Sequence, residues 1–140
     1  MTVAFPDPDI ETPDVDLAAF EAAAVDPDAF DHAAHVYVAW LYLRRMSLHD
    51  AIGRYTRALR QLTDRLGVRD KYHETITWFF LITVAERMAA DDAPDWPAFA
   101  ARHPDLVAGG MPFVARRYSR ERLGSSLARR QFVLPDRAPT

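Results

Sequence analysis

Apolar residues alternate at spacings of three and four along residues 48–66, and this pattern predicts an amphipathic helix. Ser47 is a suitable N-terminal cap for this helix, and Gly67 is suited to end it because glycine readily adopts a left-handed conformation. The apolar positions are Leu48, Ile52, Tyr55, Leu59, Leu62 and Leu66. Most other positions are polar, so the helix is expected to bury one side and expose the other.

Two more long helices are predicted, one before and one after this segment. The first spans residues 28–46, with Asp28 as its cap and Asp31 in its first turn, where a carboxylate interacts favourably with the helix dipole. The other spans residues 71–90 and follows Asp70 as a cap. It is apolar on nearly every side, so we expect it to be the central helix of the fold.

The complete pattern predicts an all-α, single-domain bundle of three long helices with short C-terminal helices. Prolines and acids make residues 1–15 a predicted flexible lead-in, residues 16–136 the helical domain, and residues 137–140 a tail. The apolar segment 132–135 is expected to dock on the body of the domain. Shorter helices are expected at residues 15–24, 96–102, 112–118 and 126–131, with a break at Gly109 and Gly110.

Composition excludes several classes of site. The 140-residue chain is 49% hydrophobic, which is ordinary for a globular protein. It has no cysteine, which excludes disulfides, thiolate zinc sites, iron–sulfur clusters and a cysteine nucleophile. The first residues lack the basic start and apolar core of a signal peptide, and no apolar run is long enough to span a bilayer. A soluble, cytoplasmic protein is therefore expected.

Charge is distributed unevenly along the chain, although the net charge is only −3. Residues 1–31 contain nine acidic side chains and no Lys or Arg, whereas residues 101–140 contain eight arginines and three acids. The simplest explanation of the preference for arginine is genomic base composition. The alternatives are an anion or nucleic-acid patch, or a basic end that pairs with the acidic start. Nucleic-acid binding ranks last, because a chain that is acidic overall has an unfavourable field for DNA.

Three histidines lie on helix faces predicted to be buried. His32 and His35 are one turn apart on the apolar stripe of the first long helix, and His73 lies at the centre of an apolar face of the third. Short connections predict that the long helices run up, down and up, so these histidines should meet at one end of the bundle. His49 and His103 are expected elsewhere.

Burial and a helix N-terminus both favour neutral imidazole, the form that binds metals. Three histidines with an open coordination position suit a catalytic zinc, and with a carboxylate they also suit iron. The candidate metal ligands are therefore His32, His35 and His73. The candidate catalytic residues are Asp31 and Glu74, as a fourth ligand or general base, and Tyr72, as a hydrogen-bond donor to substrate.

Other roles for these histidines stay open. They could be core residues whose ring nitrogens bond a hydroxyl or a backbone carbonyl, with Thr77 and Tyr42 as candidate hydroxyls. They could also form a metal-free acid–base site, or bind an anion between two helix N-termini.

Two segments that contain these histidines resemble a bacterial family of small, uncharacterised helical proteins. The shared patterns are Phe-x-His-x-x-His at residues 30–35 and Lys-Tyr-His-Glu-Thr-x-Thr at residues 71–77, with later similarity at residues 118–121 and 132–136. The resemblance covers about Phe30 to Asp136. It implies that the two histidine segments act together, and it supplies no activity, cofactor or substrate.

The functional expectation is a small helical enzyme with a histidine-rich, metal-dependent site, holding zinc or iron, that acts on a small polar substrate. The alternative is a non-catalytic binding or accessory protein whose histidines are structural or bind an anion. Exposed apolar positions and Trp78 leave room for a homodimer.

Overall fold

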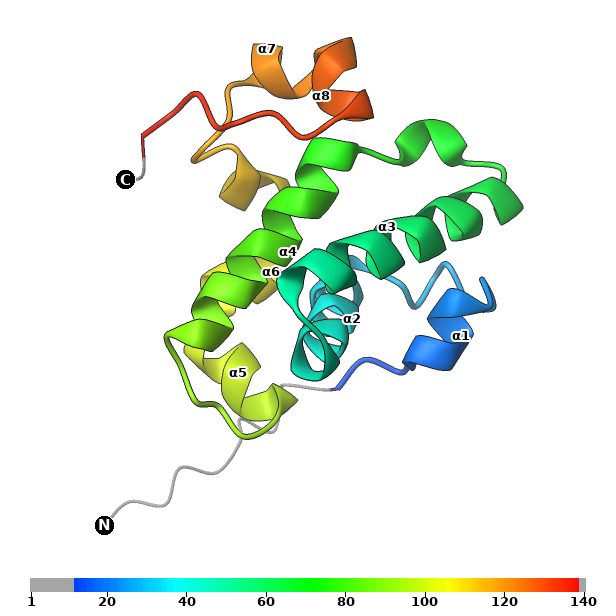
Figure 1. Cartoon of the computed structure of the whole chain (residues 1–140), viewed down its shortest axis with the longest axis vertical. Helices are drawn as coiled ribbons and strands as arrows, with labels where there is room; N and C mark the ends of the chain where they lie inside the picture. The colour runs from blue at the N-terminus through cyan, green and yellow to red at the C-terminus, as the bar shows by residue number, and fades with distance from the viewer. Residues whose placement is uncertain (1–11, 139–140) are drawn as a thin grey trace.

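A computed structural model describes residues 12–138 of the chain (Figure 1). This part of the chain is helical, without strands, which confirms the all-α fold class. None of its helices is long and apolar enough to cross a membrane. Most of the predicted lead-in lies outside the described residues. The helices are α1 (Leu17–Glu21), α2 (His32–Arg45), α3 (Leu48–Arg65), the 3-10 turn η1 (Arg69–Lys71), α4 (Glu74–Ala89), α5 (Trp96–Arg102), α6 (Pro104–Val114), α7 (Arg120–Leu123) and α8 (Ser126–Arg130).

The start of each long helix is set by one side chain that accepts a hydrogen bond from the first turn. Ser47 caps α3 as predicted. The predicted start of α2 at Asp28 is wrong, because Asp31 accepts from the Ala34 amide and the helix begins at His32. The predicted start of α4 is also wrong. Asp70 lies in η1, and His73 is the residue that caps α4.

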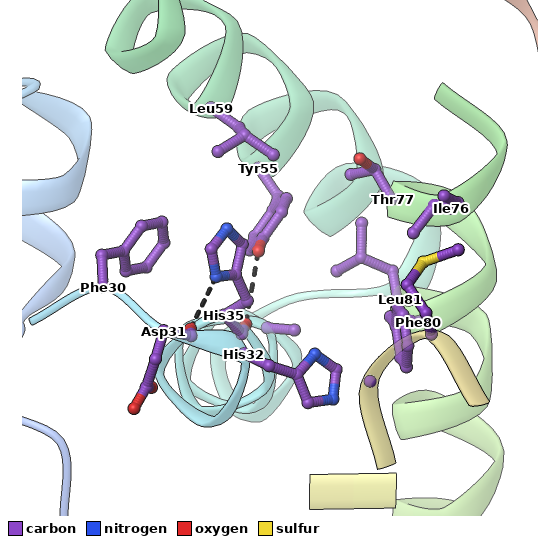
Figure 2. Close-up of a pocket in the computed structure, with 13 residues that line it drawn as sticks. Phe30, Asp31, His32, His35, Tyr55, Leu59, Ile76, Thr77, Phe80 and Leu81 are labelled. Atoms are coloured by element: carbon purple, nitrogen blue, oxygen red, sulfur yellow. Dashed lines mark hydrogen bonds between the residues drawn. The ribbon is translucent and has the colours of Figure 1, made fainter. Parts of the chain in front are cut away.

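The long helices cross one another, and this corrects the expected up-down-up bundle. In Figure 2 the axis of α2 points almost at the viewer, whereas α4 runs lengthwise across the same view. The connection between α3 and α4 contains η1 and two extended residues, Tyr72 and His73, and this longer path allows α4 to leave α3 at an angle. The first turn of α2 consequently faces the middle of α4 rather than its start.

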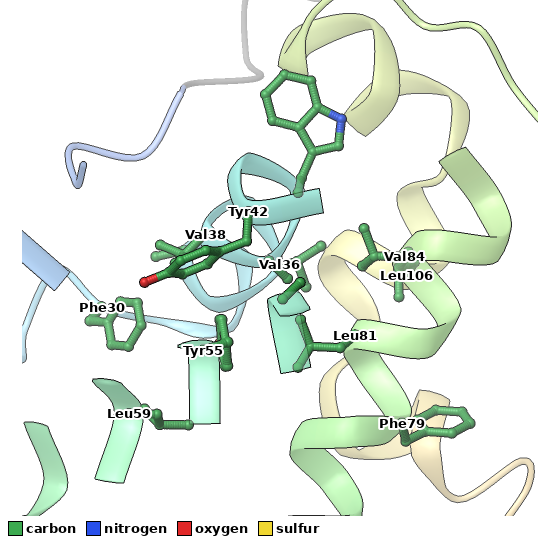
Figure 3. Packing of buried hydrophobic residues seen from close by; sticks show 14 of the residues in the cluster. Phe30, Val36, Val38, Tyr42, Tyr55, Leu59, Phe79, Leu81, Val84 and Leu106 are labelled. Atoms are coloured by element: carbon green, nitrogen blue, oxygen red, sulfur yellow. The ribbon is translucent and has the colours of Figure 1, made fainter. Parts of the chain in front are cut away.

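The core forms where α2, α4 and α6 meet (Figure 3). Val36 of α2, Val84 of α4 and Leu106 of α6 are each at most 1% exposed. Contacts with α3 close this core from another side, and Phe20 of α1 is completely buried. The central position predicted for the apolar helix α4 agrees with its packing against α2, α3, α6 and α8.

Helix α8 and the residues that follow it cover the N-terminal part of α4. The hydroxyl of buried Thr75 donates to the carbonyl of Ala128 (2.7 Å) and accepts from the amide of Val133 (3.2 Å). Residues 132–135 dock in part as expected: Val133 is buried and the ring of Phe132 stacks on Trp78, whereas Leu134 is 69% exposed.

Helix α6 extends across the predicted break at Gly109 and Gly110. The predicted break corresponds to a kink in α6, because Gly110 has non-helical backbone dihedral angles, with φ of 54°. A short helical piece follows this kink, as expected, but it spans residues 111–114 rather than 112–118, and residues 115–118 form a turn and a bend.

Candidate functional site

A cavity of about 350 Å³ lies between α2, α3, α4 and the kink of α6. His32 and His35 line it, and most of the other lining side chains are apolar (Figure 2). A cavity of this size and character is typical of small-molecule sites, which combine apolar walls with few polar groups. The main apolar walls are Phe30, Tyr55, Leu59, Ile76, Phe80 and Leu81.

His32 uses one ring nitrogen to hold its position. Its Nε2 lies 3.0 Å from the carbonyl oxygen of Leu106, and because a carbonyl only accepts, Nε2 carries the proton and donates. The ring also packs edge-on against Phe80, with 4.8 Å between centroids. In the neutral ring Nδ1 is then a free acceptor, and no group within residues 12–138 bonds to it.

His35 is oriented in the same way through its other nitrogen. Its Nδ1 donates to the carbonyl of Asp31 at 2.7 Å, which leaves Nε2 unprotonated in the neutral ring. The ring stacks on Phe30, with 3.9 Å between centroids, and stands between Phe30 and Tyr55 in Figure 2. Burial lowers the pKa of His35, and the neighbouring His32 lowers it further. His35 is therefore neutral near pH 7.

His73 lies at a different place and has no free ring nitrogen. Its Nδ1 accepts from the amide of Ile76 (3.2 Å) as the cap of α4, and its Nε2 donates to the carbonyl of Leu123 (2.8 Å). Burial, and secondarily the charge of Arg129, lower its pKa. These contacts match the core-residue alternative, with backbone partners in place of hydroxyls.

The prediction that the three histidines meet at one end of the bundle is therefore wrong. His32 packs against Phe80 of α4, about two turns beyond the start of that helix, and His35 lines the same cavity. His73 precedes the first turn of α4 and lines a second cavity. Across residues 12–138, no group of three or more His, Cys, Asp or Glu side chains is placed to hold a metal ion.

The predicted catalytic residues lie apart from the cavity or point away from it. Glu74 accepts from the hydroxyl of Tyr72 and from Arg60 (2.9 Å), and the guanidinium of Arg60 lies over the Tyr72 ring. Neither Glu74 nor Tyr72 lines the cavity. Burial and the bond to Glu74 raise the pKa of Tyr72, so the phenol stays protonated. These residues form a contact between α3 and α4.

Asp31 borders the cavity through its backbone. Its carboxylate caps α2 and points away from both imidazoles in Figure 2, while its carbonyl oxygen orients His35. Asp31 is therefore placed to position a histidine rather than to act on a ligand.

Sequence reasoning missed the second cavity, which has a volume of about 650 Å³ and lies beside the first. Arg120, Arg129 and Arg137 line it together with His73. The excess of arginine in the last 40 residues was the only sequence signal, and it did not indicate which arginines share a concave surface. Tyr55 was also missed as a wall of the first cavity, although its place in the apolar pattern of residues 48–66 marked it as buried.

No protein-family model matches this chain, and no curated protein or solved structure matches it. A function must therefore be argued from the residues that line its own cavities.

Proposed function

We propose that the cavity of His32 and His35 binds a small, largely apolar molecule that donates a hydrogen bond to imidazole. The observation that carries the proposal is the use of the ring nitrogens. Each ring donates to a backbone carbonyl, which leaves Nδ1 of His32 and Nε2 of His35 as acceptors among apolar walls. Both side chains are half-buried, so these two acceptors are accessible from the cavity, where a ligand donor can bond to them.

The size and character of the walls define the ligand class. A volume of about 350 Å³ accommodates a molecule of one or two rings. Apolar walls disfavour a charged group, because burying an unpaired ion is costly. A phenol, an indole or a similar ring with one O–H or N–H fits these conditions better than the small polar substrate expected from sequence.

A second candidate function is acid–base catalysis on the same ligand. The bond from Nδ1 to the Asp31 carbonyl fixes the tautomer of His35 and presents Nε2 as a base. The lowered pKa keeps that base unprotonated near pH 7. In this proposal His35 would take a proton from the bound molecule, and Asp31 would position the ring through its backbone.

Phenol and anisole make a direct test, because they share a ring and only phenol carries a donor. Binding should be followed by NMR of the histidine ring nitrogens in protein without a histidine tag. Phenol should bind at least about fivefold more tightly than anisole and should shift Nε2 of His35. Equal affinities, or histidine signals that do not move, would contradict the proposal.

Matched variants assign the signal to the cavity. His35→Gln should abolish the preference for phenol, whereas His49→Gln, at an exposed position on α3, should leave it unchanged. Titration with Zn²⁺ and Fe²⁺ tests the metal prediction in the same spectra. Shifts of His32 and His35 at stoichiometric metal would support a metal site, and absence of uptake would contradict it.

A further inference from the structure

The second cavity lies where the start of α4, the end of α6, α7, α8 and the C-terminal tail meet. It is adjacent to the first cavity, because Ile76 and Met111 line both. Arg120 at the start of α7, Arg129 on α8 and Arg137 in the tail face it from three separate segments. Its volume, about 650 Å³, is that of a small-molecule site.

Positive charge is concentrated in this cavity without a compensating carboxylate. No Asp or Glu is among its lining residues. Six other arginines lie within 4.0 Å of a carboxylate, whereas no carboxylate of residues 12–138 approaches these three that closely. Other arginines of residues 12–138 also lack a carboxylate within this distance, but in this cavity three such arginines line one concave surface.

Two of the three guanidinium groups are held in place by neutral partners. Arg129 donates from Nη1 to the carbonyl of Asp70 (2.7 Å), and Arg137 donates from Nη1 to the carbonyl of Ala115 (2.8 Å). A guanidinium has five N–H donors, so each keeps donors for a ligand, and a backbone carbonyl does not neutralise the charge. Positioned guanidinium groups of this kind suit planar or tetrahedral oxyanions.

We propose that this cavity is an oxyanion site that binds the phosphate or carboxylate group of a small molecule through Arg120, Arg129 and Arg137. The concave shape favours a small anion over a nucleic-acid backbone, which binds to extended basic surfaces. The site is independent of the ligand proposed for the neighbouring cavity and can be tested without it.

Titration with inorganic phosphate and with acetate tests the site, with ionic strength held constant with NaCl. The side-chain N–H signals of arginine are observed by NMR. We expect saturable shifts of Arg129 and Arg137, and the stronger of the two anions identifies the ligand group. Arg129→Gln should weaken binding about tenfold, and Arg130→Gln, which makes the same charge change on the same helix outside the cavity, should change it less than about twofold.

The variant Arg120→Gln keeps the proposal falsifiable if loss of the Arg129–Asp70 contact unfolds the protein. The exposed side chain of Arg120 makes no hydrogen bond within residues 12–138, so its replacement should not disturb the fold. It should also weaken phosphate binding about tenfold. Equal weakening by Arg130→Gln would overturn the proposal in favour of general charge attraction. A uridine oligonucleotide that binds far more tightly than phosphate, with a steep salt dependence, would overturn it in favour of a nucleic-acid surface.

Discussion

Replacing His73 with alanine should destabilise the protein through two lost hydrogen bonds rather than through a lost ligand. The variant removes the acceptor for the Ile76 amide at the start of α4 and the donor to the Leu123 carbonyl. Loss of a helix cap costs about 1 kcal/mol, and leaving a carbonyl of low exposure without a partner costs about 1–2 kcal/mol. Together these give about 2–3 kcal/mol, or a fall in Tm of about 6–10 °C for a chain of this length.

The pH dependence of this loss follows from the protonation state of the ring. The folded-state pKa of His73 lies below its ordinary value of 6.5, so the unfolded chain binds the proton more readily. The contribution of His73 is therefore fully present above about pH 6.5 and is lost as the pH falls through the lowered folded-state pKa. The stability gap between wild type and His73→Ala should narrow from pH 7.5 to pH 5. His35, whose pKa is also lowered, adds a loss of the same sign that both proteins share.

Urea unfolding followed by circular dichroism at a series of pH values measures both effects. His73→Asn should recover about 1 kcal/mol relative to His73→Ala, because an asparagine side chain can cap α4 while the bond to Leu123 stays lost. His49→Ala, at an exposed position, is the control and should change stability by less than about 0.5 kcal/mol. A gap of less than about 0.5 kcal/mol for His73→Ala, or a gap that widens on acidification, would refute the capping role.

Three further predictions concern residues that hold the helices together around the cavities. Thr75→Val should cost about 2 kcal/mol in urea unfolding and accelerate amide exchange in α8, because the Thr75 hydroxyl bonds three backbone groups of the C-terminal segment. The double variant Tyr72→Phe/Glu74→Gln should lower the free energy of unfolding by about 1 kcal/mol. It should leave the affinity for phenol unchanged, since neither residue lines the first cavity, and a loss of phenol binding would restore their predicted role in the site. Gly110→Ala should lower Tm, because a residue with a side chain at φ of 54° is destabilised by about 1 kcal/mol. Gly53→Ala on α3 should raise Tm, and equal changes in the two variants would argue against backbone strain at Gly110.

Helical periodicity was sufficient to predict which way His32 and His35 face, because both lie inside α2 and share its buried stripe. The same argument failed for His73, because a periodicity count assumes a residue within the helix, and His73 is the residue before the first turn. The side chain of a cap points back to the helix start, and Nδ1 of His73 accordingly accepts from the Ile76 amide. Histidine is not among the usual cap residues, and Asp70 was therefore the better candidate from sequence.

The angle between α2 and α4 could not be predicted from the sequence. A helix that is apolar on nearly every side, as α4 is, gives no preferred face from which to infer a crossing direction. The short connection between α3 and α4 suggested that these helices run antiparallel, but η1 forms within this connection and lengthens it. The second cavity, lined by Arg120, Arg129 and Arg137, forms where α4, α6 and the C-terminal segment meet, so composition could indicate its charge but not its location.

Met111 and its two neighbours lie where two cavities of opposite character meet. Gly110 borders only the apolar cavity, Pro112 borders only the arginine cavity, and Met111 borders both. A single unbranched side chain, 54% exposed and next to a kink, therefore forms part of the partition. A shorter residue at position 111 would thin that wall without removing a buried core side chain. For the ligands proposed above, such a substitution would enlarge the space between the two cavities, with the histidines, the arginines and the helices left intact.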